Sequence, residues 1–302
     1  MKYYLGVDIG GTNVKFGLVS EKGKLISKQK YPTANFVKGG DFIKGFSEAL
    51  EEQLKTHASK NIKYVGIGCP GLISRDRTTT LKLQNIPVLN GVNVIKSLTK
   101  NFPSITFKLE NDAKVAALGE HHFSSHKSPS FLMITLGTGV GGAAVIDGKL
   151  FNGANGNGIE IGHMISSTGE IFEYHIGKKG LVRKALNLLA KNPDIISDLR
   201  KKPAITAKDI ENGGKKGDPI AKKVFKNTGK YLGQCIVSSL RVLDIDTIII
   251  GGGVADVFNL MEKRMWKEIH FHLGEYYTQK LTIRVAELEN EAGIIGAASL
   301  NM

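Results

Sequence analysis

The stretch "LGVDIGGTNVKFG", Leu5 to Gly17, combines a glycine pair with a carboxylate, a hydroxyl and an ammonium. Two adjacent glycines separate an apolar run from an alternating run, which predicts two strands joined by a tight turn. Successive backbone N–H groups in such a turn form an anion-binding nest, to which the Thr12 hydroxyl and the Lys15 ammonium add donors. Asp8, just before the turn, would repel a phosphate unless Mg²⁺ lay between them. The stretch therefore predicts half of a magnesium–nucleotide site.

The rest of the chain alternates predicted strands and helices. Residues 3–31 read as three successive strands, and the apolar spacing of residues 40–56 predicts a helix that is capped by Asp41. In the lysine-rich segment further along, Gly213 and Gly214 predict a loop. Strands that alternate with helices indicate an α/β protein with buried sheets.

A second stretch, "FLMITLGTGVGGAAVIDGKLF" from Phe131 to Phe151, repeats the order strand, glycine turn, strand, with Thr135 in the place of Asp8. We interpret it as a weak internal duplication, in which two similar halves offer glycine turns to one shared cleft. The alternative is two unrelated β-meanders. Its "GTGVGG" does not predict a dinucleotide site, because a strand and not a helix follows the glycines. A third glycine turn follows a strand in "IIIGGG".

Two further groups of polar residues are candidates for chemistry. Asn111 and Asp112 lie between a predicted strand and a predicted helix. Asp112 is there either a helix N-cap or a base that accepts the proton of an attacking hydroxyl. Glu160 and His163, three residues apart after a glycine-rich loop, and the later Glu173 suit the hydroxyls of a sugar. A lone histidine is more often structural, so this group is the weaker signal.

Composition narrows the class of protein. The 302 residues include 41 Lys and Arg against 28 Asp and Glu, and the scattered lysines read as solvated helix surface and not as a nucleic-acid site. Cys69 and Cys235 are too few for a disulfide framework or a cysteine-rich metal site. No apolar run is long enough to cross a bilayer, and the first residues lack a signal-peptide pattern. We therefore expect a cytoplasmic protein.

Taken together, the motifs resemble the ROK family of sugar kinases and repressors. The likeness runs in order over almost the whole chain, through "DIGGT", "GIGCPGLI", "NIPVLNGV", "ENDAKVAALGE", "LGTGVGG", "GIEIGH", "IIIGGG" and "EAGIIGAAS". The resemblance implies an actin/hexokinase-like α/β fold of two RNase-H-like domains around a central cleft. It also implies ATP-dependent phosphorylation of a hexose, most simply glucose at its 6-hydroxyl.

The resemblance implies a role for each matching residue. Asp112 would be the general base and Asp8 would orient Mg²⁺ through water. The sugar hydroxyls would be held by Asn111, Glu160, His163 and Glu173. The nucleotide would be bound by Gly10, Gly11, Thr12, Lys15, Thr138, Gly139, Gly252 and Gly253.

One segment departs from the family pattern. Most members follow the Gly-His pair with a cysteine-rich segment that binds a structural zinc, whereas this chain has "MISSTGEIFEYHIG". We therefore expect ATP and Mg²⁺ as cofactors and no zinc. Apolar packing is the expected replacement for the metal, by Met164, Ile165, Ile171, Phe172 and Tyr174.

The family resemblance leaves alternatives open. Zinc-less relatives include N-acetylmannosamine kinases, so N-acetylmannosamine or another N-acylhexosamine is the alternative substrate. A non-catalytic sugar-binding protein is a further alternative. A repressor is disfavoured, because the first glycine turn leaves no room for a preceding DNA-binding domain.

We expect a small N-terminal domain over residues 1–112, with helix 291–302 packed back on it, and a larger one over 113–290. The expected partners are a small-molecule sugar and ATP, without nucleic acid or membrane, in a homodimer.

Overall fold

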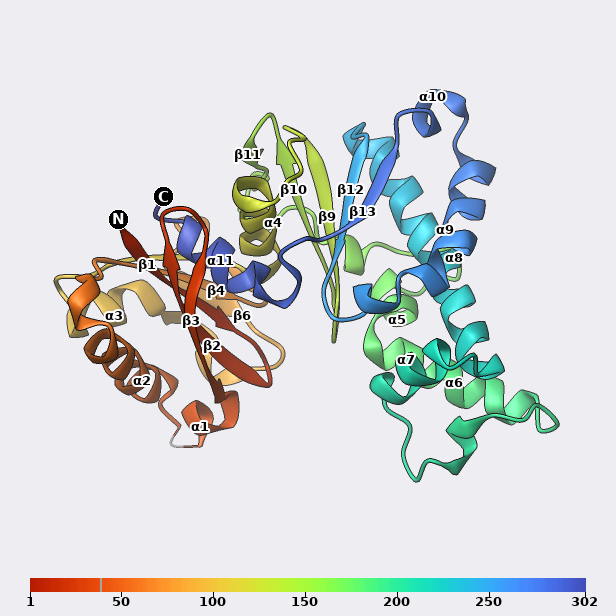
Figure 1. Cartoon of the computed structure of the whole chain (residues 1–302), viewed down its shortest axis with the longest axis horizontal. Helices are drawn as coiled ribbons and strands as arrows, with labels where there is room; N and C mark the ends of the chain where they lie inside the picture. The colour runs from red at the N-terminus through yellow and green to blue at the C-terminus, as the bar shows by residue number, and fades with distance from the viewer. Residues whose placement is uncertain (39) are drawn as a thin grey trace. The chain divides into compact units, whose positions relative to one another are not determined.

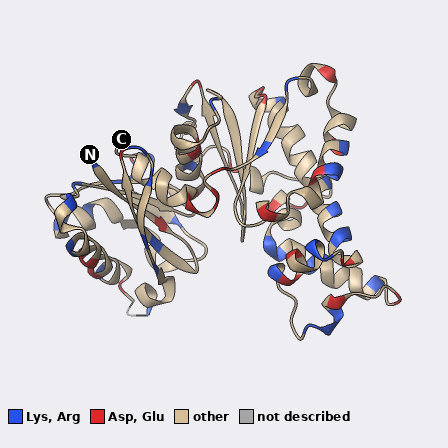
Figure 2. Cartoon of the chain, viewed as in Figure 1, with Lys and Arg blue, Asp and Glu red and all other residues tan. Residues whose placement is uncertain are grey.

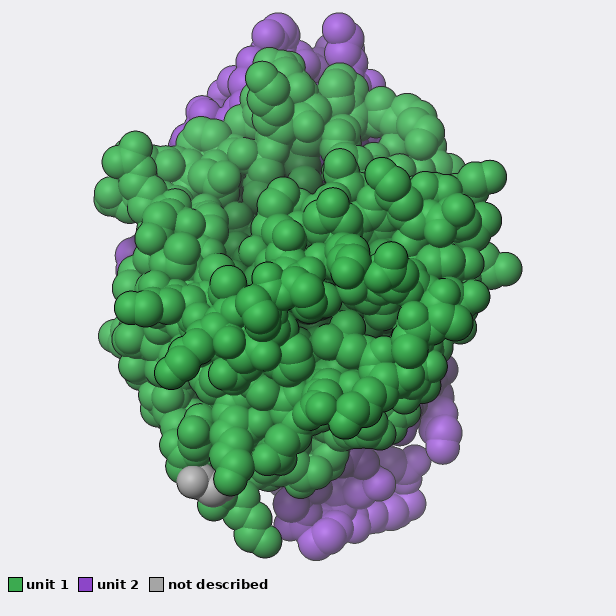
Figure 3. All heavy atoms as spheres, turned by 90° about the vertical axis from the view of Figure 1, so that its left-hand side faces the viewer, with its two compact units in different colours: residues 1–129, 143–159, 287–302 green, residues 130–142, 160–286 purple. Residues whose placement is uncertain are grey.

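The computed structural model describes residues 1–38 and 40–302. These residues form two compact units, which Figure 3 distinguishes by colour. Unit 1 comprises residues 1–129, 143–159 and 287–302, and unit 2 comprises residues 130–142 and 160–286. The chain therefore passes between the units several times.

A five-stranded sheet forms the centre of unit 1. Its order is β3-β2-β1-β4-β8, in which β1, β2 and β3 are antiparallel and β1, β4 and β8 are parallel (Figure 1). The first three strands confirm the prediction for residues 3–31. The strands are β1 (Tyr3–Ile9), β2 (Asn13–Ser20), β3 (Leu25–Pro32), β4 (Tyr64–Cys69) and β8 (Thr106–Asn111).

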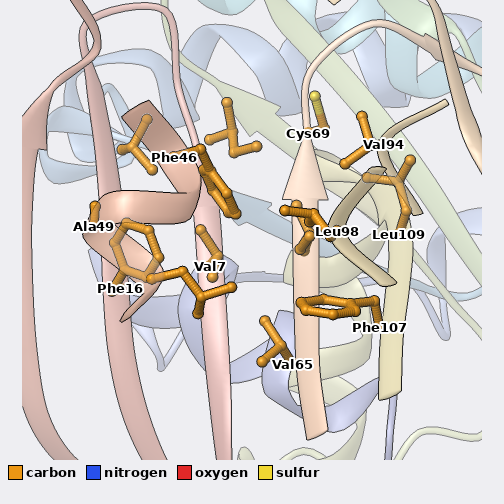
Figure 4. Packing of buried hydrophobic residues seen from close by; sticks show 14 of the residues in the cluster. Val7, Phe16, Phe46, Ala49, Val65, Cys69, Val94, Leu98, Phe107 and Leu109 are labelled. Carbon is orange, nitrogen blue, oxygen red and sulfur yellow. The ribbon is translucent and has the colours of Figure 1, made fainter. Parts of the chain in front are cut away.

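Alternation along β1 separates the two faces of this sheet. Val7 points with Phe16 and Val65 into an apolar core that is closed by α2 (Phe42–Thr56) and α3 (Val94–Asn101), as Figure 4 shows for Phe46 and Leu98. Helix α2 confirms the helix predicted at residues 40–56. Its Asp41 cap is also confirmed, because that side chain accepts a hydrogen bond from the Lys44 N–H at 3.0 Å.

The opposite face of the sheet is covered by α4 (Asp112–Phe123) and α11 (Ala292–Ser299). Here β1 and β4 carry glycines because the helix backbone comes very close. A Cβ atom on Gly6 would overlap the Ile294 carbonyl, and one on Gly66 would overlap the Ala297 carbonyl. Asp8 lies on this same face, next to Gly293 of α11.

A second five-stranded sheet has the order β11-β10-β9-β12-β13. Strands β9, β12 and β13 are parallel, and β10 and β11 are antiparallel. A small antiparallel sheet has the order β5-β6-β7. These strands are β9 (Phe131–Leu136), β10 (Val140–Ile146), β11 (Lys149–Leu150), β12 (Thr247–Gly251), β13 (Thr282–Val285), β5 (Leu72–Ile73), β6 (Thr79–Lys82) and β7 (Val92–Asn93).

The longest helix of unit 2 is α8 (Pro219–Leu243), which packs on α5, α6, α7 and α9. The Asp218 side chain caps its start by accepting the N–H groups of Ile220 and Ala221, each at 2.9 Å. The remaining helices are α1 (Thr33–Val37), α5 (Phe172–Ile176), α6 (Lys178–Lys191), α7 (Ala207–Lys215), α9 (Asn259–His272) and α10 (Glu275–Thr278). The 3₁₀ turns are η1 (Ala58–Lys60), η2 (Pro87–Leu89), η3 (Ile161–His163), η4 (Asp198–Lys201), η5 (Ala255–Val257) and η6 (Glu289–Glu291).

The loop predicted at Gly213 and Gly214 is wrong, because both residues lie within α7. A capping box at Thr206 and Asp209 fixes the start of α7. A Cβ atom on Gly214 would press on the Phe225 ring of α8, at 3.0 Å, so the small residue permits close helix packing. Tertiary packing here outweighs the low helix propensity of glycine.

Charge is spread over the helical part of unit 2. Lys and Arg residues lie along α6, α7 and α8 with acidic residues among them (Figure 2). Within the described ranges, no helix combines the length and the apolar character needed to cross a bilayer.

Candidate active site

The predicted site residues are divided between the two units. In unit 1, Asp8 and Lys15 are direct cross-strand partners of β1 and β2. Their side chains form an ion pair, with Lys15 Nζ 2.7 Å from Asp8 Oδ2. The exposed fractions of the two side chains are 29% for Lys15 and 18% for Asp8. The cation and the anion of the predicted nucleotide half-site are therefore already in contact.

The turn between β1 and β2 holds the predicted phosphate-binding glycines. The Gly10 N–H donates to the Asn13 carbonyl at 2.9 Å, and the Thr33 hydroxyl donates to the Gly10 carbonyl at 2.6 Å. Neither Gly10 nor Gly11 has a left-handed φ value. Gly11 instead permits a close approach, because its Cβ would lie 2.8 Å from that of Asn85. Gly11 and Thr12 are exposed at the tip of the turn.

Asn111 and Asp112 mark the boundary between β8 and α4. Asn111 is the N-cap, and its Oδ1 accepts the N–H groups of Ala113 at 3.0 Å and Lys114 at 3.3 Å. Its Nδ2 donates to the Gly71 carbonyl at 3.2 Å. Asp112 is the first helical residue, and its Oδ1 also accepts the Ala113 N–H, at 2.8 Å. The cap position is therefore occupied by Asn111 and not by Asp112.

Asp8 and Asp112 lie toward the same edge of the sheet. Asp8 pairs with Gly68 near the carboxyl end of β4, and Cys69 at that end pairs with Asn111. Burial raises the pKa of the Cys69 thiol well above its ordinary value, and the nearby carboxylates of Asp112 and Asp8 raise it further. Asp8 and Asp112 are therefore both near the Cys69 thiol. Mg²⁺ is usually bound by one or two carboxylates together with phosphate oxygens and water, so Asp8 and Asp112 fit that ion.

A buried charge network behind Asn111 was not predicted from the sequence. Glu110 is 4% exposed, and its Oε2 lies 3.1 Å from Arg77 Nε. Arg77 Nη2 and Lys114 Nζ both donate to the Asn152 side chain and to the Gly156 carbonyl, at 2.6–3.0 Å. Burial raises the pKa of Glu110, opposed by the Asn111 N–H and by the two cations. The sequence feature that could have indicated this network is Lys114, a charged residue within the apolar run "AKVAALG".

In unit 2, the turn between β9 and β10 carries Thr138 and Gly139. The Gly137 N–H donates to the Gly139 carbonyl at 2.9 Å, which closes the turn. Glu173 Oε2 accepts the Val140 N–H at 2.9 Å, and a Cβ atom on Gly139 would overlap that oxygen. Glu173, which the resemblance assigns to the sugar, is therefore attached to the turn assigned to the nucleotide.

Glu160 and His163 bracket the 3₁₀ turn η3. His163 Nδ1 lies 3.2 Å from Glu160 Oε2, so the spacing of three residues brings them together. Their side chains are 51% exposed for His163 and 40% for Glu160. Between them, Gly162 packs against the Val140 carbonyl, where a Cβ atom would not fit. Gly162, between the two residues of the pair, and Glu173 thus both contact Val140, the first residue of β10.

The segment that replaces the zinc-binding cysteines is a short hairpin. Ile165 and Ile171 form a β-bridge, and the Phe172 N–H donates to the Met164 carbonyl at 2.9 Å. Phe172 is 2% exposed, as the packing prediction requires. The prediction is wrong for Ile165, which is 65% exposed. The Tyr174 ring is 39% exposed, and the Arg183 guanidinium of α6 lies over it at 3.1 Å from its centroid. In the described residues no group of three or more His, Cys, Asp or Glu is placed to hold a metal ion.

His175 provides a further anchor for this hairpin that the sequence did not predict. Its ring stacks on Tyr231 of α8, with centroids 3.8 Å apart and planes at 6°. Its Nε2 lies 2.8 Å from the Thr168 hydroxyl in the hairpin. Burial lowers the pKa of His175, as do the Arg183 and Lys184 charges, partly opposed by Glu170. A neutral ring that stacks on an aromatic neighbour suits a structural role.

The third glycine turn follows β12. Gly252 has a φ of 83°, and the Val254 N–H donates to the Leu136 carbonyl at 3.1 Å. Gly251 pairs in parallel register with Thr135. The turns after β9 and β12 therefore lie at the carboxyl ends of adjacent parallel strands, the edge at which α/β sheets bind ligands.

Comparison with known proteins gives one consistent result. The sequence model of the ROK family matches residues 4–302. A glucokinase from Halalkalibacterium halodurans is 28% identical, over 99% of this chain and 94% of that protein. A crystal structure from Cytophaga hutchinsonii is 38% identical with a TM-score of 0.90, over 99% of both chains. The ROK family glucokinase of Streptomyces griseus, in complex with glucose and AMPPNP, is 27% identical with a TM-score of 0.85, over 99% of this chain and 98% of that chain. These likenesses confirm the predicted actin/hexokinase-like fold.

Proposed function

Since the chain belongs to the ROK family, we propose that this ATP-dependent sugar kinase acts on a hexose, with glucose as the preferred acceptor and its 6-hydroxyl as the attacking group. The observation that carries the proposal is the start of α4. Asn111 caps the helix, so the carboxylate of Asp112 is not needed as the cap. Phosphoryl transfer to an alcohol uses a residue that orients the hydroxyl and accepts its proton, and a carboxylate suits this role. We assign that role to Asp112.

On the donor side, the residues of the β1–β2 turn bind phosphate in this proposal. Gly10, Gly11 and Thr12 present backbone and hydroxyl donors, and Lys15 contributes its charge. The Lys15 ammonium has three donors, so its ion pair with Asp8 leaves capacity for a phosphate oxygen. Asp8 would hold Mg²⁺ through water. When bound, that ion supplies neutralisation of the charge on the transferred phosphoryl group.

On the acceptor side, Glu160, His163 and Glu173 hold sugar hydroxyls together with Asn111. Glu173 Oε2 accepts the Val140 N–H, so its Oε1 is the oxygen that we assign to the sugar. Thr138 and Gly139 bind phosphate in this proposal, and Gly139 packs against the Glu173 carboxylate so closely that a Cβ atom would not fit. The arrangement in unit 2 thus joins a sugar contact to a phosphate turn through one side chain.

A coupled ADP-release assay across acceptors tests this function. Purified protein with MgATP is given glucose, mannose, fructose, allose, N-acetylglucosamine or N-acetylmannosamine, with Asp112→Asn as the control for sugar-independent ATP hydrolysis. We expect the highest kcat/KM with glucose. The missing cysteine segment favours N-acetylmannosamine as the second candidate, and a higher kcat/KM for that sugar would replace glucose. ADP release at the control level with every sugar would refute the kinase.

A further inference from the structure

Lys178 is fixed beside both glycine turns of unit 2. It is the first residue of α6, and its backbone N–H donates to the Gly137 carbonyl at 3.1 Å. Gly177, just before it, packs so closely on the other turn residue that a Cβ atom would lie 3.1 Å from the Thr138 carbonyl. These two contacts hold the backbone of Lys178 next to the turn between β9 and β10.

The side chain of Lys178 extends to the other turn. Its Nζ lies 3.6 Å from the position that a Cβ atom on Gly253 would occupy. The side chain is half-buried, and it makes no ion pair or hydrogen bond within the described ranges. Other lysines of this unit do find acidic partners, such as Lys202 with Asp209 at 2.8 Å. A half-buried ammonium without a counter-charge thus lies next to two turns at the carboxyl edge of the sheet.

We propose that Lys178 binds the phosphate chain of the nucleotide, as a second cation besides Lys15. This inference rests on the proposed function and extends its donor side. An ammonium is a compact point charge that suits phosphate oxygens. Backbone N–H groups of the turn at Thr138 and Gly139 would surround the same phosphates. A nucleotide bound across the turns at 137–139 and 252–253 would place its anionic part within reach of Lys178, whose Nζ lies beside Gly253 and whose backbone N–H is bonded to Gly137.

The test compares nucleotide affinity in three variants. Lys178→Ala removes the charge, Lys178→Arg keeps it, and Lys179→Ala removes the charge of the exposed neighbour on the same helix. Isothermal titration calorimetry measures the Kd of Mg-AMPPNP, MgADP and adenosine for each full-length protein. We expect Lys178→Ala to weaken AMPPNP and ADP binding about tenfold or more and to leave adenosine binding unchanged. Lys178→Arg should recover most of the loss, and Lys179→Ala should resemble the wild type.

Separate outcomes identify which proposal fails. If Lys178→Ala binds AMPPNP as tightly as the wild type, or loses adenosine to the same extent, the phosphate role of Lys178 is wrong. If the wild type binds AMPPNP and Lys178→Ala binds it weakly, but no sugar is phosphorylated, the inference about Lys178 stands and the proposed acceptor chemistry fails. An unchanged thermal unfolding midpoint of Lys178→Ala shows that the loss is not caused by misfolding.

Discussion

At the start of α4, Asn111 caps the helix and Asp112 places a carboxylate beside the cap. The Asn111 side chain satisfies the first N–H groups of the helix, and the Asp112 carboxylate lies where the helix dipole stabilises an anion. An Asp at this point of a sequence is ambiguous, because it also suits a cap. The sequence alone does not show which of the two residues is the cap. The hydrogen bonds of Asn111 show that it is Asn111. The contact between Asp8 and Lys15 was also not evident from the sequence, because it follows from the register of β1 and β2 and not from a spacing of seven residues.

The role of Asp112 leads to a prediction for Asp112→Asn. The amide cannot accept the hydroxyl proton, so kcat should fall about 10²–10⁴-fold, the usual contribution of a general base. The glucose Kd from calorimetry should change little, because the other hydroxyl contacts remain. Asp41→Asn is the matched control, since it removes the charge from the N-cap of α2 and should keep full activity. A kcat of Asp112→Asn above half of the wild-type value would reduce Asp112 to a structural residue.

Among the helices and strands, the sequence predicted those whose residues show a clear periodicity or a clear cap. The strands of residues 3–31 and the capped helix α2 follow from periodicity and local capping. The features that sequence patterns did not predict come from contacts between distant residues. Gly214 lies in a helix, where it packs closely on Phe225, and Glu173 forms a hydrogen bond with Val140 that no pattern indicated. Local propensity carries no information on either contact.

The hairpin at residues 164–172 leads to a prediction about metal dependence. Structural zinc sites need about four ligands, usually Cys and His. Here we expect the β-bridge, the buried Phe172 ring and the stacking of His175 on Tyr231 to hold the segment in place of such a site. Purified protein should therefore contain no stoichiometric zinc by elemental analysis, and its kinase activity should return fully when Mg²⁺ is restored after EDTA treatment. One zinc per chain, with irreversible loss of activity on its removal, would contradict this account of the hairpin.

For the whole molecule, the stability of unit 1 depends on segments far apart in the sequence. Helix α11 fills the face of the sheet formed by β1 and β4 and also packs on α4. Tyr4, Ile294 and Ala298 form a small apolar cluster there. The helix backbone approaches the strands so closely that only glycine fits at two strand positions, which a sequence pattern of buried strands does not reveal. Such close packing makes the unit sensitive to very small increases in volume.

This sensitivity predicts a large effect of Gly66→Ala. The added methyl group would overlap the Ala297 carbonyl, a backbone atom that moves only if α11 moves. Overpacking of this kind typically costs about 1–3 kcal/mol, so the urea midpoint should fall. Hydrogen exchange should become faster in β1, β4 and α11 before it does in α8. Gly274→Ala is the control, because nothing lies within 4 Å of its added Cβ and its φ is not left-handed, so its midpoint should match the wild type. Equal midpoints for both variants would mean that α11 does not press on the sheet, and the close approach of helix and strands would have to be abandoned.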